Sequence, residues 1–169
     1  MAHIYGKNWT KAEILPYVGD ISQLARVKPY RLVEGHEEGV LAVDVTTSSG
    51  LDFTVLPSRG MDISSAHHNG RAMMWRSACA DQHPAFFEPE ERRWLRSFYG
   101  GLVLTCGLTW MGASCTDEGE PLGIHGRVSN LPATNVQWDG QWEGDDYILS
   151  VSGRVREANV FGENVELRR

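Results

Sequence analysis

The chain has 169 residues, of which 41% are hydrophobic and 22% are charged, and its formal net charge is −6. These values are ordinary for a globular domain with a real core. The negative charge and the lack of a basic stripe argue against a nucleic-acid partner. No apolar run reaches the ~20 residues that a membrane span needs, and the N-terminus lacks the pattern of a secretory signal. We therefore expect a cytoplasmic protein without a membrane partner.

The first elements in chain order are predicted from capping signals and from hydrophobic alternation. Residues 20–26 begin with cap-forming residues before a short apolar run, which predicts a short helix. Apolar and polar residues then alternate in residues 39–46 and 51–56, the period of a half-buried strand. The dipeptide Asn69-Gly70 tolerates positive φ at both positions and predicts a hairpin turn.

The second half of the chain continues the β pattern after one helical stretch. Residues 88–98 place proline and acidic residues early and arginines late, which predicts a second short helix. Asp139-Gly140 predicts another hairpin turn. A strand follows in residues 146–155, where Gly153 indicates a bulge or a close backbone approach. We therefore predict a mainly antiparallel all-β fold with short helical excursions, in one domain that covers residues 1–169.

The C-terminal residues, NVELRR, end while a strand pattern is still running. A strand without a hairpin partner exposes an edge, which proteins usually avoid. One interpretation is a C-terminal edge strand that ends in charges. The interpretation we favour is that the chain is the front part of a longer β domain. An incomplete domain would leave Glu166 on an unpaired strand and would favour a homodimer through exposed strand edges.

The cysteines and histidines do not predict a disulfide or a metal site. Cys79, Cys106 and Cys115 are odd in number and irregularly spaced, and none lies in a C-x-x-C pair. His67 and His68 are adjacent, and adjacent strand residues point to opposite faces, so they cannot chelate one metal from regular strand geometry. We expect no metal ion and no cofactor.

Residues 120–130 read EPLGIHGRVSN and place a histidine and an arginine on either side of one glycine. This step fits neither a packed core nor a helix, so it predicts a loop that presents polar groups to a ligand. Histidine suits proton transfer because its pKa lies near ~6.5, so both forms are accessible at neutral pH. Arginine supplies a rigid fork of hydrogen-bond donors.

Four blocks of sequence together resemble the aldose 1-epimerase-like (galactose mutarotase-like) superfamily, and in particular an uncharacterised bacterial branch of it. The blocks are GDISQLARV, FTVLPSRGMDI, WLRSFYGGLVLTCGLTWMG and PLGIHGRVSNLPA, between about Gly19 and Pro132. The resemblance implies a large antiparallel β-supersandwich with a sugar held in a cleft on one sheet. Because the family's domain is usually much longer than this chain, we expect residues 1–169 to form an incomplete sandwich.

The resemblance also implies roles for particular residues. His125 matches the first histidine of the family's H-G motif and is the catalytic candidate. The predicted substrate-binding residues are Arg59, Arg127, Gly126 and Trp110. Each has a structural alternative: a loop histidine bonded to backbone, an exposed turn arginine, a salt bridge, a simple turn, or a core tryptophan. We expect His125, Arg127 and Arg59 to converge on one concave polar surface.

The predicted function is that of a sugar mutarotase or epimerase that interconverts anomers by acid/base proton transfer. The family's second histidine and its catalytic glutamate would lie beyond Arg169, so we expect this chain alone to be inactive. Sugar-phosphate-specific relatives carry an arginine near the position of Arg127, but the spacing differs and the phosphate role is not carried over. The alternatives are a non-catalytic carbohydrate-binding protein and a structural fragment with an incomplete cleft.

Overall fold

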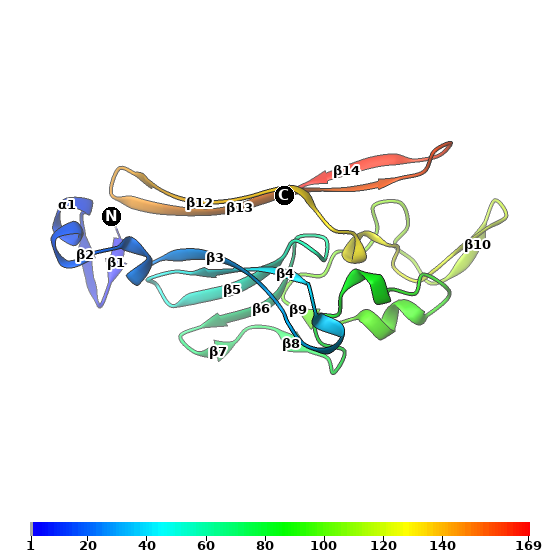
Figure 1. The fold of residues 1–169 in the computed structure, drawn as a ribbon, viewed down its shortest axis with the longest axis horizontal. Helices are drawn as coiled ribbons and strands as arrows, with labels where there is room; N and C mark the ends of the chain where they lie inside the picture. Colours follow the sequence, from blue (N-terminus) through cyan, green and yellow to red (C-terminus); the bar gives the residue numbers. More distant parts are fainter. Residues whose placement is uncertain (1) are drawn as a thin grey trace.

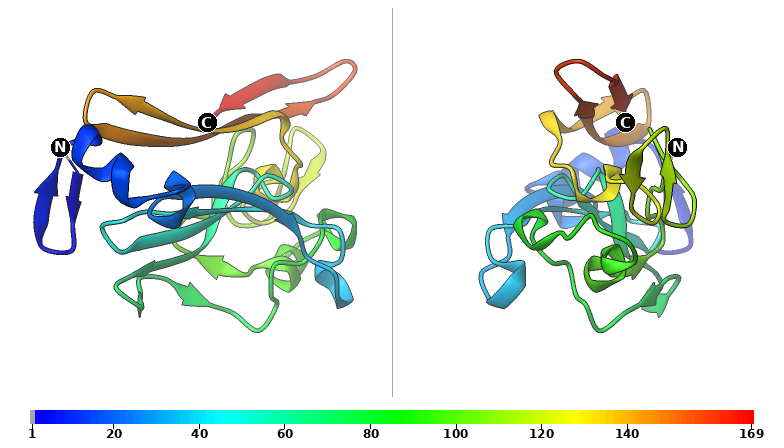
Figure 2. Two further views of the ribbon diagram at one scale, coloured as in Figure 1. Left: turned by 60° about the vertical axis from the view of Figure 1, so that its left-hand side comes forward. Right: turned by 90° about the vertical axis from the view of Figure 1, so that its right-hand side faces the viewer.

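The computed structural model describes residues 2–169, and antiparallel sheet dominates it, which confirms the predicted fold class. A five-stranded sheet has the order β3-β4-β5-β6-β7, and a three-stranded sheet has the order β12-β13-β14. The smaller sheet forms a layer on one side of the larger one (Figures 1 and 2). The strand bounds are β3 Arg26–Arg31, β4 Leu41–Thr46, β5 Leu51–Leu56, β6 Asp62–His68, β7 Arg71–Ala72, β12 Thr134–Glu143, β13 Asp146–Ala158 and β14 Asn164–Arg168.

The main core lies between the two sheets. Its buried members are Val43, Val55, Met61, Val128 and Val155. The alternation predicted for β4 and β5 puts the first two on one face of the larger sheet, and Val155 faces them from β13. Burial of each such side chain stabilises the fold by roughly 1.5–3 kcal/mol. This sandwich fixes β13 over the larger sheet.

Gly153 confirms the predicted close backbone approach within β13. A Cβ atom at this position would lie 2.9 Å from the Sδ atom of Met61. That separation is shorter than van der Waals contact, so the Met61 side chain would have to shift to admit a larger residue. The glycine therefore lets β13 seat closely on the main core.

A second hydrophobic cluster covers the opposite face of the larger sheet. It contains Val40, Ala42, Leu56 and Tyr99, all fully buried. Tyr99 belongs to the long segment between β7 and β12 in the sequence, here called the excursion, which crosses this face. The excursion contains β8 Trp75–Arg76, η4 Pro84–Phe86, η5 Arg93–Ser97 and β9 Gly100–Gly101, and it continues through the hairpin β10 Cys115–Asp117 and β11 Glu120–Leu122 to η6 Val128–Asn130.

The predicted helices are shorter in the structure than in the sequence pattern. The stretch at 20–26 is a single 3-10 turn, η2 Ile21–Gln23, whose Asp20 side chain accepts a hydrogen bond from the Ser22 amide at 2.8 Å. The stretch at 88–98 contains only the 3-10 helix η5. The remaining elements of the first forty residues are β1 Ala2–Ile4, β2 Lys7–Trp9, α1 Lys11–Ile14, η1 Leu15–Tyr17 and η3 Gly35–Glu37. No helix among residues 2–169 combines the length and apolarity needed to cross a bilayer.

One of the two predicted hairpin turns is confirmed and the other is wrong. Asn69 and Gly70, at φ +49° and +74°, connect β6 to β7. Gly140 instead lies inside β12, paired with Leu149, and the turn follows at Gly144, where φ is +62°. A Cβ atom at Gly140 would lie 2.5 Å from the Tyr147 hydroxyl oxygen, so this glycine makes room for a cross-strand ring.

The prediction of an unpaired final strand is also wrong. β14 pairs antiparallel with β13, from Asn164 opposite Ala158 to Arg168 opposite Arg154. Glu166 forms ion pairs with Arg156 at 2.9 Å and with Arg168 at 2.8 Å. β14 pairs with the edge of β13 that β12 does not use, since Arg154 lies opposite both Thr134 of β12 and Arg168 of β14.

Candidate functional site

The loop that carries the HGR step, here called the His-Gly-Arg loop (residues 123–127), connects β11 to η6. Its backbone is tied to a neighbouring loop: the His125 amide donates to the Gly112 carbonyl at 2.9 Å, and the Gly107 amide donates to the His125 carbonyl at 3.0 Å. His125 and Gly126 both have positive φ, +64° and +74°. A Cβ atom at Gly126 would lie 2.3 Å from the Trp110 carbonyl oxygen, so only glycine fits there.

The His-Gly-Arg loop separates two clefts. The aromatic cleft is lined by Trp75, Trp94, Leu95, Phe98, Gly100, Gly101, Leu104, Cys106 and His125. The acidic cleft is lined by Pro89, Leu108, Thr109, Trp110, Asp117, Glu120, Pro121, Leu122, Gly123, Gly126, Arg127, Glu157, Glu163 and Val165. The structure therefore brings together three of the predicted residues, Gly126, Arg127 and Trp110, and turns His125 to the other cleft.

The acidic cleft has a volume of about 600 Å³, a size typical of small-molecule sites. Two residues that line it hold a buried side-chain atom that has no hydrogen-bond partner among residues 2–169: Oε2 of Glu157 and Nε1 of Trp110. Glu157 projects from β13 and is only 4% exposed. Buried polar atoms are normally paired in proteins, so an unpaired acceptor and an unpaired donor in one cleft indicate a ligand site.

The electrostatics of the acidic cleft centre on Glu157. Burial raises the pKa of this carboxyl group and is the largest influence on it. A hydrogen bond with the Thr109 side chain and the charge of Arg127 lower that pKa, and the charge of Glu163 raises it. The net direction is upward, so the protonated form of Glu157 is more accessible than that of an exposed glutamate. Such a group can both accept and return a proton.

The aromatic cleft, of about 460 Å³, is built on contacting rings. The His125 ring meets Trp94 edge-on, with centroids 4.9 Å apart, and Trp94 stacks on Phe98 at 5.2 Å. The Trp94 indole donates to the Ser129 hydroxyl oxygen at 3.2 Å, which fixes the floor to η6. Trp75, 62% exposed, forms the rim. Burial raises the pKa of the Cys106 thiol, which disfavours the nucleophilic thiolate form.

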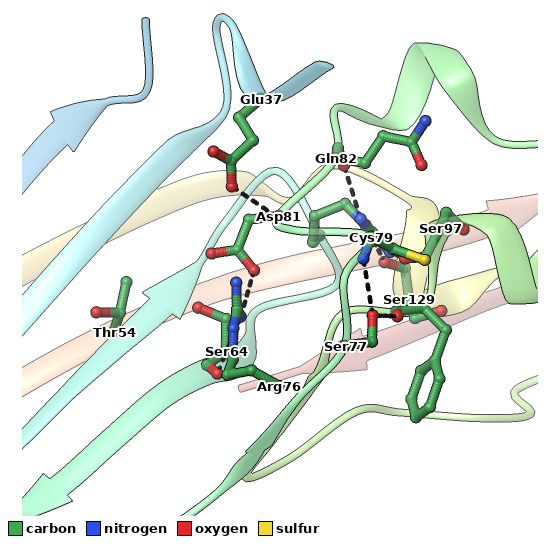
Figure 3. Close-up of polar contacts among 12 residues, drawn as sticks. Glu37, Thr54, Ser64, Arg76, Ser77, Cys79, Asp81, Gln82, Ser97 and Ser129 are labelled. Carbon is green, nitrogen blue, oxygen red and sulfur yellow. Dashed lines mark hydrogen bonds and ion pairs between the residues drawn. The ribbon is translucent and has the colours of Figure 1, made fainter. Parts of the chain in front are cut away.

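Arg59 does not reach either cleft, which corrects its predicted role as a sugar contact. The residue is 1% exposed, and each of its three nitrogens donates to a backbone carbonyl. The acceptors are Ser129 at 2.8 Å, Gln82 at 2.7 Å and Ser97 at 2.9 Å, which Figure 3 shows gathered in one place. The guanidinium also lies 4.9 Å from the centre of the Tyr99 ring. Arg59 therefore clamps three loops, and it cannot share an open surface with His125 and Arg127.

A set of polar side chains next to the Arg59 clamp connects it to the larger sheet. Arg76 donates to Asp81 and to the Ser64 carbonyl, at 2.7 Å and 3.1 Å, and Glu37 accepts from the Asp81 amide at 2.8 Å (Figure 3). These bonds tie the excursion to η3 and β6. No group of three or more metal-ligating side chains occurs in the described part of the chain.

The sequence-based predictions do not include Glu157, although the sequence holds a signal for it. In β13, Gly153, Val155 and Glu157 share the buried face. A carboxylate that continues an apolar stripe is rarely left buried without a function or a partner. This alternation is hard to recognise in the sequence, because charged residues flank Glu157 and the run RVREA resembles a solvated strand end.

Comparisons with known proteins agree with this fold. The family model described as "Domain of unknown function (DUF4432)" matches residues 37–169. A crystal structure of a candidate aldose 1-epimerase from Klebsiella pneumoniae subsp. pneumoniae MGH 78578 has a TM-score of 0.72 and 23% sequence identity. The match covers 96% of this chain and 47% of that protein, so this chain spans about half of its length. No curated protein matches the chain. The chain belongs to the DUF4432 family, with an aldose 1-epimerase-like β-sandwich fold.

Proposed function

We propose that the acidic cleft binds a sugar, and that the whole protein exchanges sugar anomers by proton transfer. One observation carries this proposal: two residues that line the same cleft, Trp110 and Glu157, each hold a buried polar atom without a hydrogen-bond partner among residues 2–169, the indole N–H and a carboxylate oxygen. A hydroxyl group donates and accepts at once, so neighbouring sugar hydroxyls satisfy both atoms. Each buried polar atom left unpaired costs roughly 1–3 kcal/mol, which a bound sugar recovers.

Arg127 and Gly126 complete the proposed site. The guanidinium of Arg127 is exposed in the cleft and offers several donors to sugar oxygens. Gly126 has no side chain, which lets the His-Gly-Arg loop pack against the Trp110 backbone and keeps Arg127 and Trp110 at the same cleft. These two residues and Trp110 keep the substrate-binding role expected from the sequence.

The proposed reaction opens and recloses the sugar ring. A base removes the proton of the anomeric hydroxyl O1, the C1–O1 bond becomes double, and the C1–O5 bond breaks as O5 takes a proton. After rotation about C1–C2, the reverse steps close the ring on the other face, so no atom or electron is gained or lost. We assign Glu157 as a proton-transfer group, because its raised pKa makes both of its forms accessible.

A rival placement of the sugar follows from the aromatic cleft. Trp75 and Phe98 offer apolar ring faces of the kind that stack on sugars, and His125 lies beside them. In this placement His125, the catalytic candidate expected from the sequence, lies against the sugar. The acidic cleft is favoured because it holds the unpaired polar atoms, whereas the aromatic cleft offers few hydrogen-bonding groups.

The two placements are separated by paired variants assayed for anomer exchange by NMR in the whole protein. Glu157→Gln should lower the exchange rate by ~10²–10⁴-fold, the usual contribution of a proton-transfer group. Trp110→Phe should weaken sugar binding, whereas Trp138→Phe, on β12 outside both clefts, should not. Loss of exchange in His125→Asn and Trp75→Ala, with Glu157→Gln unaffected, would move the sugar to the aromatic cleft. Binding without exchange in the whole protein would support a non-catalytic carbohydrate-binding protein.

A further inference from the structure

The acidic cleft holds an excess of negative charge that sugar hydroxyls alone do not require. Four carboxylates line it, those of Asp117, Glu120, Glu157 and Glu163, and Arg127 is its one basic residue. None of the four forms a salt bridge with another residue of the described chain. Elsewhere in the same chain, carboxylates such as Glu88 and Glu166 each pair with two arginines.

Three separate elements bring these charges together. Glu157 lies at the end of β13, Glu163 precedes β14 in the following turn, and Asp117 and Glu120 flank the tip of the β10–β11 hairpin. Two of these charges act on each other, since Glu163 raises the pKa of Glu157. Unpaired like charges repel and weaken a fold. Asp117, Glu120 and Glu163 are exposed, whereas Glu157 is 4% exposed and has one unpaired oxygen, so the cleft offers negative charge to a cation both at its surface and in its interior.

Building on the proposed function, we infer that the sugar of the acidic cleft carries a protonated amino group. An ammonium group has three donors and no acceptor, so it suits the carboxylates of Glu157 and Glu163. The hydroxyl and ring oxygens of the same molecule accept from the Trp110 indole and the Arg127 guanidinium. A hydroxylated amine therefore satisfies both kinds of unpaired group, whereas a simple cation leaves the indole N–H without a partner.

The same charges exclude acidic sugars. A phosphate or carboxylate group would pair with Arg127, but four carboxylates would surround the complex. Arg127 also supports the charge of Glu157, because its guanidinium lowers the pKa of that group. The single arginine thus balances one of the four negative charges and leaves the cleft attractive to cations.

The test is calorimetric binding to the full chain with a matched set of sugars: glucosamine, glucose, N-acetylglucosamine and glucose 6-phosphate. We expect glucosamine to bind about tenfold more tightly than glucose, as a small network of ion pairs would give. N-acetylglucosamine keeps the ring but loses the charge, so it should bind no better than glucose, and glucose 6-phosphate should bind least. The preference for glucosamine should shrink as salt is added, because exposed charges are screened.

Matched variants locate the effect. Glu163→Gln should reduce the preference for glucosamine about threefold, and Glu157→Gln should abolish it. Glu118→Gln is the control, because Glu118 lies between Asp117 and Glu120 in the hairpin but does not line the cleft. An equal loss of preference in Glu118→Gln would show a general surface charge effect and would overturn the inference.

The outcomes also separate this inference from the proposed function. Equal or tighter binding of glucose, with Trp110→Phe weakening it, would overturn the amine inference and leave the sugar site standing. Ethanolamine binding as tightly as glucosamine would show that the sugar ring is not recognised and would overturn the amino-sugar assignment. Failure of every sugar to bind would remove both the proposed function and this inference.

Discussion

The Arg59 clamp and the acidic cleft each contain a buried charged residue, but the two residues differ in whether their polar atoms have hydrogen-bond partners. Arg59 is 1% exposed, and all three of its nitrogens donate to carbonyls. Glu157 is 4% exposed, and one of its oxygens has no partner among residues 2–169. A satisfied buried charge holds a fold together, whereas an unsatisfied one weakens it and marks a place for a ligand. Pairing, rather than burial alone, separates structural from functional residues here.

The largest expected effect is the loss of the clamp. Arg59→Met should destabilise the chain by about 3–5 kcal/mol, because three buried carbonyls lose their donor at once. Arg59→Lys should recover only part of this loss, since an ammonium cannot reproduce the fork. Urea unfolding followed by tryptophan fluorescence measures both, with Arg71→Met on the exposed strand β7 as control. A stable Arg59→Met protein would show that the clamp is not structural.

Gly126 lies in the loop that separates the two clefts, so its substitution tests how tightly that loop must pack. Gly126→Ala should cost about 2–3 kcal/mol, from a positive φ and from a Cβ atom placed 2.3 Å from the Trp110 carbonyl oxygen. Gly119→Ala is the matched control, because Gly119 has φ +90° but nothing within 4 Å. It should show the cost of φ alone, about 1 kcal/mol. Equal losses in the two variants would mean that the close approach at Gly126 is relieved at little cost.

The sequence predicted the framework better than the site, for physical reasons. Alternation in residues 39–46 and 51–56 reports local burial on one sheet face, so these strands were found. The hairpin turn predicted at Asp139-Gly140 is wrong because a glycine beside a cross-strand ring and a glycine in a turn look alike in sequence. Arg59 reads as an exposed turn residue because its acceptors, at Gln82, Ser97 and Ser129, come from distant loops that only the fold assembles.

The candidate site shows the same limit. Trp110, Gly126 and Arg127 were chosen from sequence and share one cleft, whereas His125 lines the other. No pattern predicts which way adjacent residues of a loop will face when both histidine and glycine adopt positive φ. Nor can spacing reveal that β13 extends past β12 and carries Glu157 into the cleft.

A smaller effect of opposite sign is expected at Glu157. Because its pKa is raised in the folded state, folding favours its protonated form, and stability falls as pH rises from the unfolded pKa through the raised folded one. Glu157→Gln should remove this loss and stabilise the chain by about 1 kcal/mol at neutral pH, with little gain at acidic pH. Urea unfolding midpoints of the unsubstituted chain and of Glu157→Gln, measured from acidic to neutral pH, give the difference in stability. A destabilised Glu157→Gln protein would indicate that the carboxylate is structural, like Arg59.

The smallest expected effect concerns Glu166, a carboxylate that is paired but lies at the surface. It contacts Arg156 and Arg168 at 2.9 Å and 2.8 Å, and these hydrogen bonds lower its pKa. Solvent screens such pairs, and ordering the long side chains offsets the attraction, so exposed ion pairs contribute little to stability. Glu166→Gln should therefore leave the urea midpoint unchanged at moderate salt, although it breaks two ion pairs. A clear loss of stability in this variant would show that ion pairs stabilise this chain at the surface as well as in the interior. Burial would then no longer explain why Arg59 contributes more to stability than an exposed ion pair.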